Sequence, residues 1–152
     1  MNQIISAKDA KNSFRYLHKQ KRNVGIWIEA EIGQFEFWYE LQQEHIEFKY
    51  INLLEDLLPK IAESNMKPFG VYDTTDFNEW IRLQAVNLDN PTGLICNQVD
   101  ALLGTFNENS AGDFFRLASN FYYVKPIVYV TKLKNLVMNT RFPSDRVWRM
   151  VD

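Results

Sequence analysis

The chain between Val24 and Ile51 alternates apolar and polar positions, a pattern typical of β-strands. Three segments rich in β-branched and aromatic residues are separated by Ile32-Gly33 and by Gln42-Gln43-Glu44, and they span residues 24–31, 34–41 and 45–51. Because these separations are short, they favour antiparallel hairpins. We therefore expect a central antiparallel β-meander over about residues 24–51.

Alternation along the three segments divides their side chains between two faces. One face is apolar and is expected to join the core. The other face combines two tryptophans with five glutamates, namely Trp27, Glu29, Glu31, Glu36, Trp38, Glu40 and Glu47. Tryptophan is common at the centre of protein interfaces, and surrounding glutamates would steer a basic partner. The alternative is that a helix covers the tryptophans and leaves the glutamates at the rim.

A spacing of three to four between apolar residues predicts helices over most of the remaining chain. Asp76, followed by Glu79, is expected to cap one of them. The expected helices lie at about residues 6–22, 52–64, 76 onward, 95–103 and 113–120. A turn is expected at 90–93, a loop at 104–112, and further strands at 69–72 and 126–131. No linker or repeat interrupts the pattern. The expectation is one α+β domain over residues 1–152, with the meander packed against an N-terminal helix and several further helices.

The formal net charge of −2 conceals a segregation of charge along the chain. Counted separately, residues 1–22 carry +5, residues 23–63 carry −7, residues 64–113 carry −5 and residues 114–152 carry +5. An acidic block is thus enclosed by two basic ends, which either compensates charge internally or marks a surface for a basic partner. The basic run at Lys19, Lys21 and Arg22 is interpreted as a solvated helix end.

Composition excludes two classes of protein. The lone Cys96 cannot form an intramolecular disulfide and is expected to be a small core residue, and no stretch approaches the roughly 18 apolar residues of a membrane-spanning helix. The N-terminal segment has no apolar region of the kind found in signal peptides. A cytoplasmic protein that does not bind a membrane is expected.

Catalytic motifs are scarce. The sequence has no nucleophile elbow, no glycine-rich loop before a helix and no zinc spacing. The best enzyme alternative is a metal-dependent nuclease in which Glu47 and Lys49 act with Glu36 or Glu29, but a face with five glutamates would repel nucleic acid. The spacing of Asp73, Asp76 and Glu79 is better explained by a helix start than by a metal site. We therefore expect no catalytic residue, metal or cofactor.

The profile of a small, single-domain chain, acidic over Trp27-Ile-Glu-Ala-Glu31 and Glu36-Phe-Trp-Tyr-Glu40, resembles the immunity proteins of bacterial toxin systems, including those of contact-dependent growth inhibition. The resemblance implies a non-enzymatic protein that neutralises a cognate toxin, here a basic nuclease domain, by covering it with the Trp/Glu surface. It also implies one-to-one protein binding by a monomer or weak homodimer, without direct nucleic-acid binding. A structural or regulatory subunit is the remaining alternative.

Overall fold

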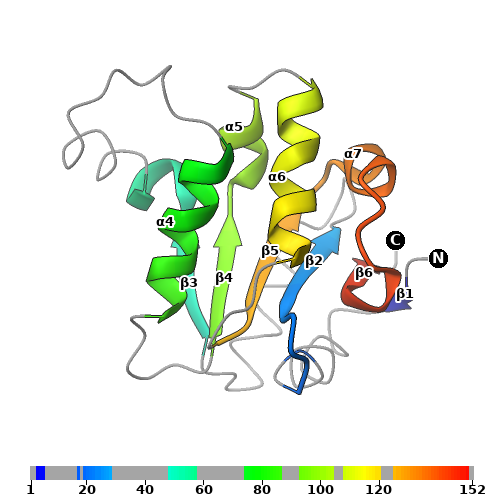
Figure 1. The fold of residues 1–152 in the computed structure, drawn as a ribbon, viewed down its shortest axis with the longest axis horizontal. Coiled ribbons are helices and arrows are strands. Elements are labelled where there is room, and N and C mark those ends of the chain that lie inside the picture. Colours follow the sequence, from blue (N-terminus) through cyan, green and yellow to red (C-terminus); the bar gives the residue numbers. More distant parts are fainter. Residues whose placement is uncertain are drawn as a thin grey trace.

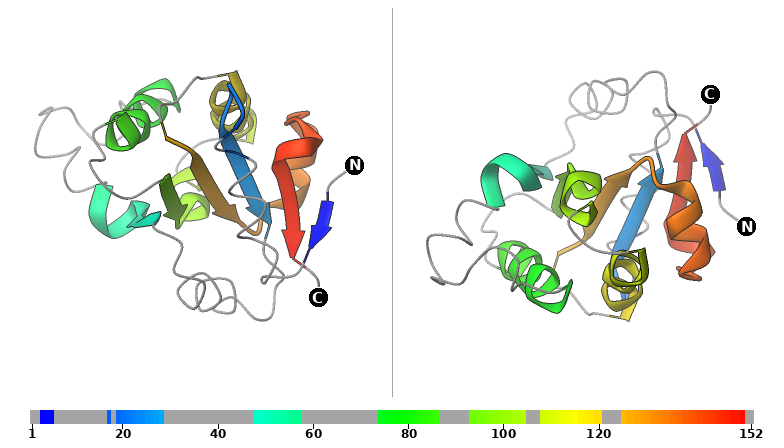
Figure 2. Two further views of the ribbon diagram at one scale, coloured as in Figure 1. Left: turned by 90° about the horizontal axis from the view of Figure 1, so that it is seen from below. Right: turned by 90° about the horizontal axis from the view of Figure 1, so that it is seen from above.

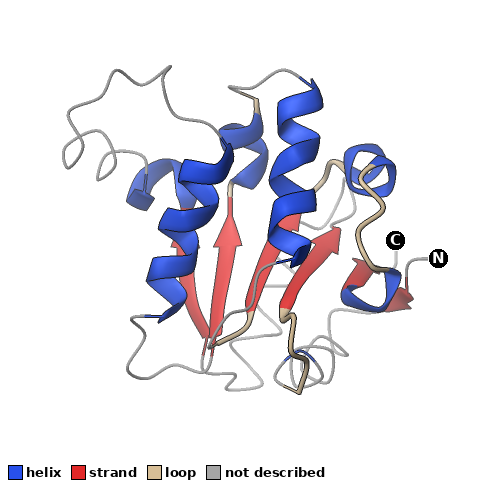
Figure 3. Cartoon of the chain, in the orientation of Figure 1, coloured by secondary structure: helices blue, strands red, loops and turns tan. Residues whose placement is uncertain are grey.

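The computed structural model describes residues 3–5, 17, 19–28, 48–57, 74–86, 93–104, 108–120 and 125–150. Strands and helices alternate along most of this part of the chain (Figures 1 and 3). In chain order the elements are β1 (Gln3–Ile5), β2 (Val24–Ile28), β3 (Phe48–Asn52), the π-helical turn η2 (Leu53–Leu57), α4 (Thr74–Val86), β4 (Gly93–Asn97), α5 (Val99–Leu103), α6 (Glu108–Asn120), β5 (Ile127–Thr131), α7 (Lys134–Asn139), the 3-10 turn η4 (Ser144–Arg146) and β6 (Val147–Met150).

The strands form one six-stranded sheet in the order β1-β6-β2-β5-β4-β3. Every recorded pairing is parallel. Parallel strands are joined by crossovers, and the helices of such crossovers cover the sheet. The fold class is therefore α/β.

The expected antiparallel β-meander is wrong. Its first and third segments do contain strands, β2 and β3, and its second segment, residues 34–41, lies outside the described residues. Instead β5 and β4 lie between them, because β2 pairs with β5 and β6 while β3 pairs with β4. Alternation indicated where strands form and carried no information about their partners, which lie tens of residues away in sequence.

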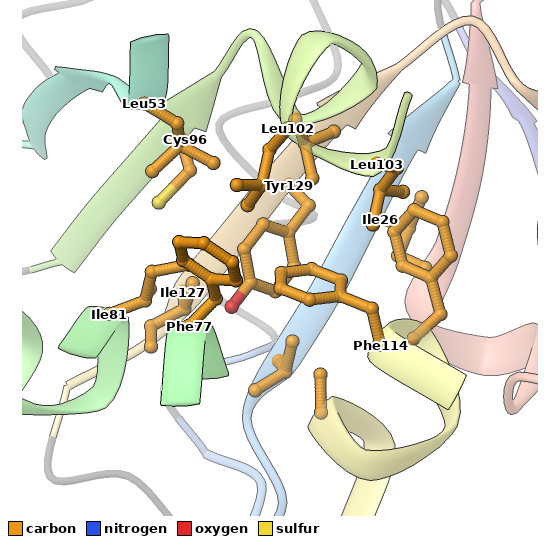
Figure 4. Close-up of a cluster of buried hydrophobic side chains, with 14 of the residues drawn as sticks. Ile26, Leu53, Phe77, Ile81, Cys96, Leu102, Leu103, Phe114, Ile127 and Tyr129 are labelled. Atoms are coloured by element: carbon orange, nitrogen blue, oxygen red, sulfur yellow. The ribbon is translucent and has the colours of Figure 1, made fainter. Parts of the chain in front are cut away.

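Helices α4 and α6 pack side by side on one face of the sheet (Figure 2). Each presents an apolar stripe at helical spacing, with Phe77, Ile81 and Ala85 on α4 and Ala111, Phe114, Phe115 and Ala118 on α6. Tyr129 of β5 projects into this layer (Figure 4), with its ring centroid 5.2 Å from that of Phe114 in an edge-on arrangement. These contacts form the larger part of the core.

The opposite face of the sheet is also buried. Ile95, Val128 and Trp148 are at most 1% exposed, and none of them belongs to the α4/α6 cluster. Trp148 of β6 lies over Gly25 of β2, together with Leu17. Only glycine fits at position 25, because any Cβ there would overlap the indole ring.

Several expected element boundaries need correction. Residues 93–97 form a strand, whereas a turn and the start of a helix were expected, and α6 begins at Glu108 within the expected loop. Helix α4 begins at Thr74, so Asp76 lies within its first turn and does not precede it as a cap. The strand expected at 126–131 is confirmed as β5. The strand expected at 69–72 and most of the first expected helix lie outside the described residues.

Candidate functional site

The ends of three neighbouring strands carry polar side chains. Because all strands are parallel, their carboxyl ends meet at one edge of the sheet, which we call the carboxyl edge. Strand β3 ends in Asn52, β4 in Asn97 and β5 in Thr131, and the first two are direct register partners. In open α/β sheets, ligands bind outside the carboxyl ends of the strands. The carboxyl edge is therefore the candidate site.

Asp100 of α5 connects two of these strand ends. Its carboxylate accepts a hydrogen bond from the Thr131 hydroxyl and another, 3.0 Å long, from the backbone N–H of Lys132. The Thr131 hydroxyl oxygen in turn accepts the N–H of Leu133 at 3.0 Å. This network joins the turn after β5 to the helix after β4, so the middle of the edge is held in one arrangement.

The turn between β4 and α5 has an uncommon backbone conformation. Gln98 has φ 63° and ψ 24°, in the left-handed region that L-residues other than asparagine and aspartate rarely adopt. The Asn97 side-chain carbonyl accepts the Gln98 N–H at 2.8 Å, which supports the turn. Asn97 and Gln98, which both carry a side-chain amide, thus lie one after the other at the carboxyl end of β4.

A second polar turn follows β3. The Asn52 side chain accepts the N–H of Glu55 at 3.1 Å, and the Asp56 carboxylate accepts the N–H of Asn52 at 3.0 Å. Glu55 and Asp56 are both exposed. The two bonds fix the start of η2 and hold its two acidic residues at the carboxyl edge.

Carboxylates gather at this edge because several acidic segments follow strands. Glu55 and Asp56 follow β3, and Asp100 follows β4. In the sequence, Glu29 and Glu31 come directly after β2, although neither lies in the described part of the chain. Lys132, after β5, is a base at the same edge. Three described acids of the block, Glu55, Asp56 and Asp100, thus reach the edge from two strands that are far apart in the chain.

The structure describes only one of the seven residues expected to bind a partner. Trp27 lies in β2, in register with Val130 and Trp148 of the two neighbouring strands. Its position in the interior of a parallel sheet differs from the expected place on a meander. The six other residues, Glu29, Glu31, Glu36, Trp38, Glu40 and Glu47, lie outside the described residues.

The nuclease alternative placed Glu36 or Glu29 on a strand of the meander next to Glu47 and Lys49. Lys49 lies on β3, the last strand of the sheet, whose recorded neighbour is β4. The three glutamates lie outside the described residues. Within the described residues, no three His, Cys, Asp or Glu side chains are grouped so as to hold a metal ion.

Cys96 and Glu79, the remaining candidate residues that the structure describes, have structural explanations. Cys96 is fully buried, and burial raises the pKa of its thiol far above the ordinary range, so it is not a reactive thiolate. A hydrogen bond from Arg82 lowers the pKa of Glu79, which belongs to an exposed pair on α4. Asp73, the third member of that acidic spacing, lies outside the described residues.

Parallel sheets often bind nucleotides outside the carboxyl ends of their strands. A phosphate site of this type uses a glycine-rich loop with a lysine after a strand, and a carboxylate at a strand end to hold Mg²⁺. Here β2 is followed in sequence by Glu29-Ala-Glu-Ile-Gly33, and β4 ends in the neutral pair Asn97-Gln98. These residues do not fit a magnesium nucleotide.

The sequence pattern missed most of the carboxyl-edge residues. Asn97, Gln98 and Asp100 were expected within a helix, because the preceding run Leu94-Ile-Cys96 is apolar without alternation. Thr131 at the end of an expected strand was the one available signal. Polar residues directly after buried strands would have indicated the edge, had the strands been expected to be parallel.

No protein-family model matches the chain, and no curated protein matches it. None of the helices in the described ranges has the length and apolar character to cross a membrane. Functional assignment therefore depends on the residues and their arrangement.

Proposed function

We propose that the chain is a non-enzymatic binding protein that holds a basic protein partner at the carboxyl edge of its sheet. A cognate toxin domain is the partner that the resemblance to immunity proteins implies. The observation that carries the proposal is the collection of Glu55, Asp56 and Asp100 at the ends of adjacent strands, with Glu29 and Glu31 next in sequence after β2. Carboxylates gathered in this way would attract and orient lysine and arginine side chains.

The arrangement favours binding over catalysis. The polar groups described at the edge bind one another: Asp100 accepts from Thr131 and Lys132, and Asn97 accepts from Gln98. Such a network gives a rigid surface, and rigid surfaces bind with a smaller entropic cost. The exposed acids Glu55 and Asp56 would then contact the partner from fixed backbone positions.

The test is binding of a decalysine peptide, which presents the lysine side chains expected of a basic partner, measured by isothermal titration calorimetry. Glu55→Lys and Glu55→Lys/Asp56→Lys should weaken binding by at least about tenfold, the loss expected when an attractive charge becomes repulsive. Glu79→Lys/Asp145→Lys makes the same charge change at exposed acids away from the edge, and should bind like the wild type. Equal affinity of all variants, or no binding by the wild type, would refute the proposal.

The single variant Glu55→Lys guards against misfolding, because the recorded hydrogen bond of Glu55 is made by its backbone. Asp56→Lys removes the bond that Asp56 makes to Asn52 and therefore needs a thermal unfolding control. Loss of binding by the single variant with an unchanged melting temperature supports the proposal. Loss of binding that appears only in variants with a lowered melting temperature counts against the proposal.

A further inference from the structure

Strand β6 has an internal place in the sheet, although it is the last described element in chain order. It lies between β1 and β2 and pairs in parallel with both (Figure 2). Trp148 is in register with Gln3 on one side and with Trp27 on the other. We call the place between β1 and β2 the β6 slot. Elements from the other end of the sequence therefore form the slot that β6 fills.

The β6 slot recognises particular side chains. It needs a large indole over Gly25, where a Cβ would come within 2.5 Å of Cζ3 of Trp148. It also needs a guanidinium two residues earlier, because the buried Arg146 donates to the carbonyls of Val24 at 2.9 Å and Ser119 at 3.1 Å. These partners belong to β2 and α6, so they do not involve the connection that leads to β6. The same contacts could therefore be made with the β6 of a second copy.

The connection that leads to β6, residues 140–143 between α7 and η4, is short and strained. Arg141 has φ 56°, in the left-handed region that is unfavourable for residues with a Cβ. Pro143 is extended, with φ −54° and ψ 123°, and a proline disfavours helical backbone at the residue before it. If residues 140–143 extended, Arg141 could return to an ordinary φ, and the connection would reach about 14 Å. Short connections under strain promote the exchange of identical elements between copies.

We propose that two copies of this chain associate by strand exchange, in which the β6 of each copy, with Arg146 before it, fills the β6 slot of the other. The exchanged dimer keeps the pairings of β6 with β1 and β2, the fit of Trp148 over Gly25 and the hydrogen bonds of Arg146. Only the connection changes, and the strain at Arg141 is relieved there. A foreign strand without this indole and this guanidinium would lose both sets of contacts, so the slot selects β6 itself.

This inference does not depend on the partner proposed for the carboxyl edge. Glu55, Asp56 and Asp100 lie outside the exchanged segment, so either proposal can fail while the other holds. Where both hold, the exchanged dimer carries two carboxyl edges and binds a multivalent basic partner with added avidity.

The first test is refolding of the full chain from urea at about 10 μM and at about 1 mM, followed by size-exclusion chromatography with light scattering. We expect a dimer whose share rises with the chain concentration during refolding. Arg141→Gly should lower the association constant by at least about tenfold, because glycine adopts the left-handed conformation freely and the monomer then has no strain to relieve. Gln98→Gly relieves the same kind of backbone, with φ 63°, outside the connection and should leave the association constant unchanged. Monomer alone at both concentrations, or equal losses in the two variants, would overturn the proposal.

A second test distinguishes strand exchange from a dimer formed through another surface. Copies with Gly25→Ala and copies with Trp148→Leu are unfolded together, refolded as an equal mixture and measured by native mass spectrometry. Exchange places the Trp148 of one copy over the Gly25 of the other and brings the two substituted positions together, so the heterodimer should exceed the share that random pairing gives. Neither variant has to fold alone, because the two are refolded together. A heterodimer at the random share would overturn strand exchange and would indicate a dimer through another surface.

Discussion

Gly25 and Trp148 form a complementary pair on neighbouring strands, in which the absence of one side chain makes room for the other. A Cβ at position 25 would lie 2.5 Å from Cζ3 of Trp148 and 2.8 Å from Cδ1 of Leu17. The backbone at Gly25 needs no special conformation, so the requirement for glycine is purely steric. The fit joins β2 to β6 on the sheet face opposite α4 and α6.

Gly25→Ala should therefore destabilise the chain by about 3 kcal/mol, at the upper end of the cost of overpacking. Trp148→Leu alone should also destabilise, because it opens a cavity. The double variant should lose clearly less free energy of unfolding than the two single variants lose in sum, since the smaller leucine makes room for the methyl group. Urea unfolding of the four proteins measures this, and strict additivity would show that the two positions do not interact as described.

Arg146 should contribute to stability through its two carbonyl acceptors. Its guanidinium donates to Val24 and Ser119 and lies 5.2 Å from the centroid of the Phe142 ring. Arg146→Lys cannot reach both carbonyls in the same geometry and should lower the free energy of unfolding by about 2 kcal/mol. Arg116→Lys, at an exposed position on α6, is the matched control and should change it by less than about 0.5 kcal/mol. Equal effects at both positions would contradict the structural role of Arg146.

The hydrogen bond between Thr131 and Asp100 should hold the carboxyl edge. Thr131→Val preserves the shape of the side chain but removes its donor, and should cost about 1 to 2 kcal/mol in thermal or urea unfolding. Amide hydrogen exchange at Lys132 and Leu133 should accelerate, because both N–H groups bind into this network. Thr140→Val, in which a partly buried hydroxyl also loses a bond to a helix carbonyl, should leave exchange at these two amides unchanged. Unchanged exchange in Thr131→Val would show that the network does not hold the turn.

Cys96 should make stability depend on pH in the alkaline range. Burial raises the pKa of its thiol far above that of an unfolded cysteine, about 8.5. Below about pH 8.5 the Cys96 thiol is protonated in both the folded and the unfolded chain, and above it the thiol ionises only in the unfolded chain. The free energy of unfolding should therefore fall by up to about 1.4 kcal/mol per pH unit above about pH 8.5, relative to Cys96→Ala. If the free energies of unfolding of the wild type and of Cys96→Ala changed equally with pH, the buried environment of the thiol would be contradicted.

The sequence predicted individual elements better than their arrangement. The period of two located β2 and β3, a short apolar run located β5, and the apolar stripe from Phe77 to Ile81 located α4. The strand pairings could not be predicted, because β2 pairs with β5 and β6 across about a hundred residues and no local pattern encodes that pairing. Alternation of helices with strands in the second half was the available sign of a parallel sheet.

The candidate site was only partly predictable for the same reason. The sequence showed an acidic block, and the parallel sheet brings Glu55, Asp56 and Asp100 to one edge of the molecule. The run from Leu94 to Cys96 is apolar throughout, as expected for a strand buried on both faces, and so was not distinguished from a helix. Asn97 and Gln98 were missed with it.

Nuclear magnetic resonance of the ¹⁵N-labelled chain, titrated with a decalysine peptide, tests the central claim most directly, namely that a basic partner binds at the carboxyl edge. We expect saturable chemical-shift changes concentrated at the amides of Asn52, Glu55, Asp56 and Asp100, with little change from Lys19 to Asn23. Changes scattered over the molecule, or centred on the basic turn before β2, would contradict it.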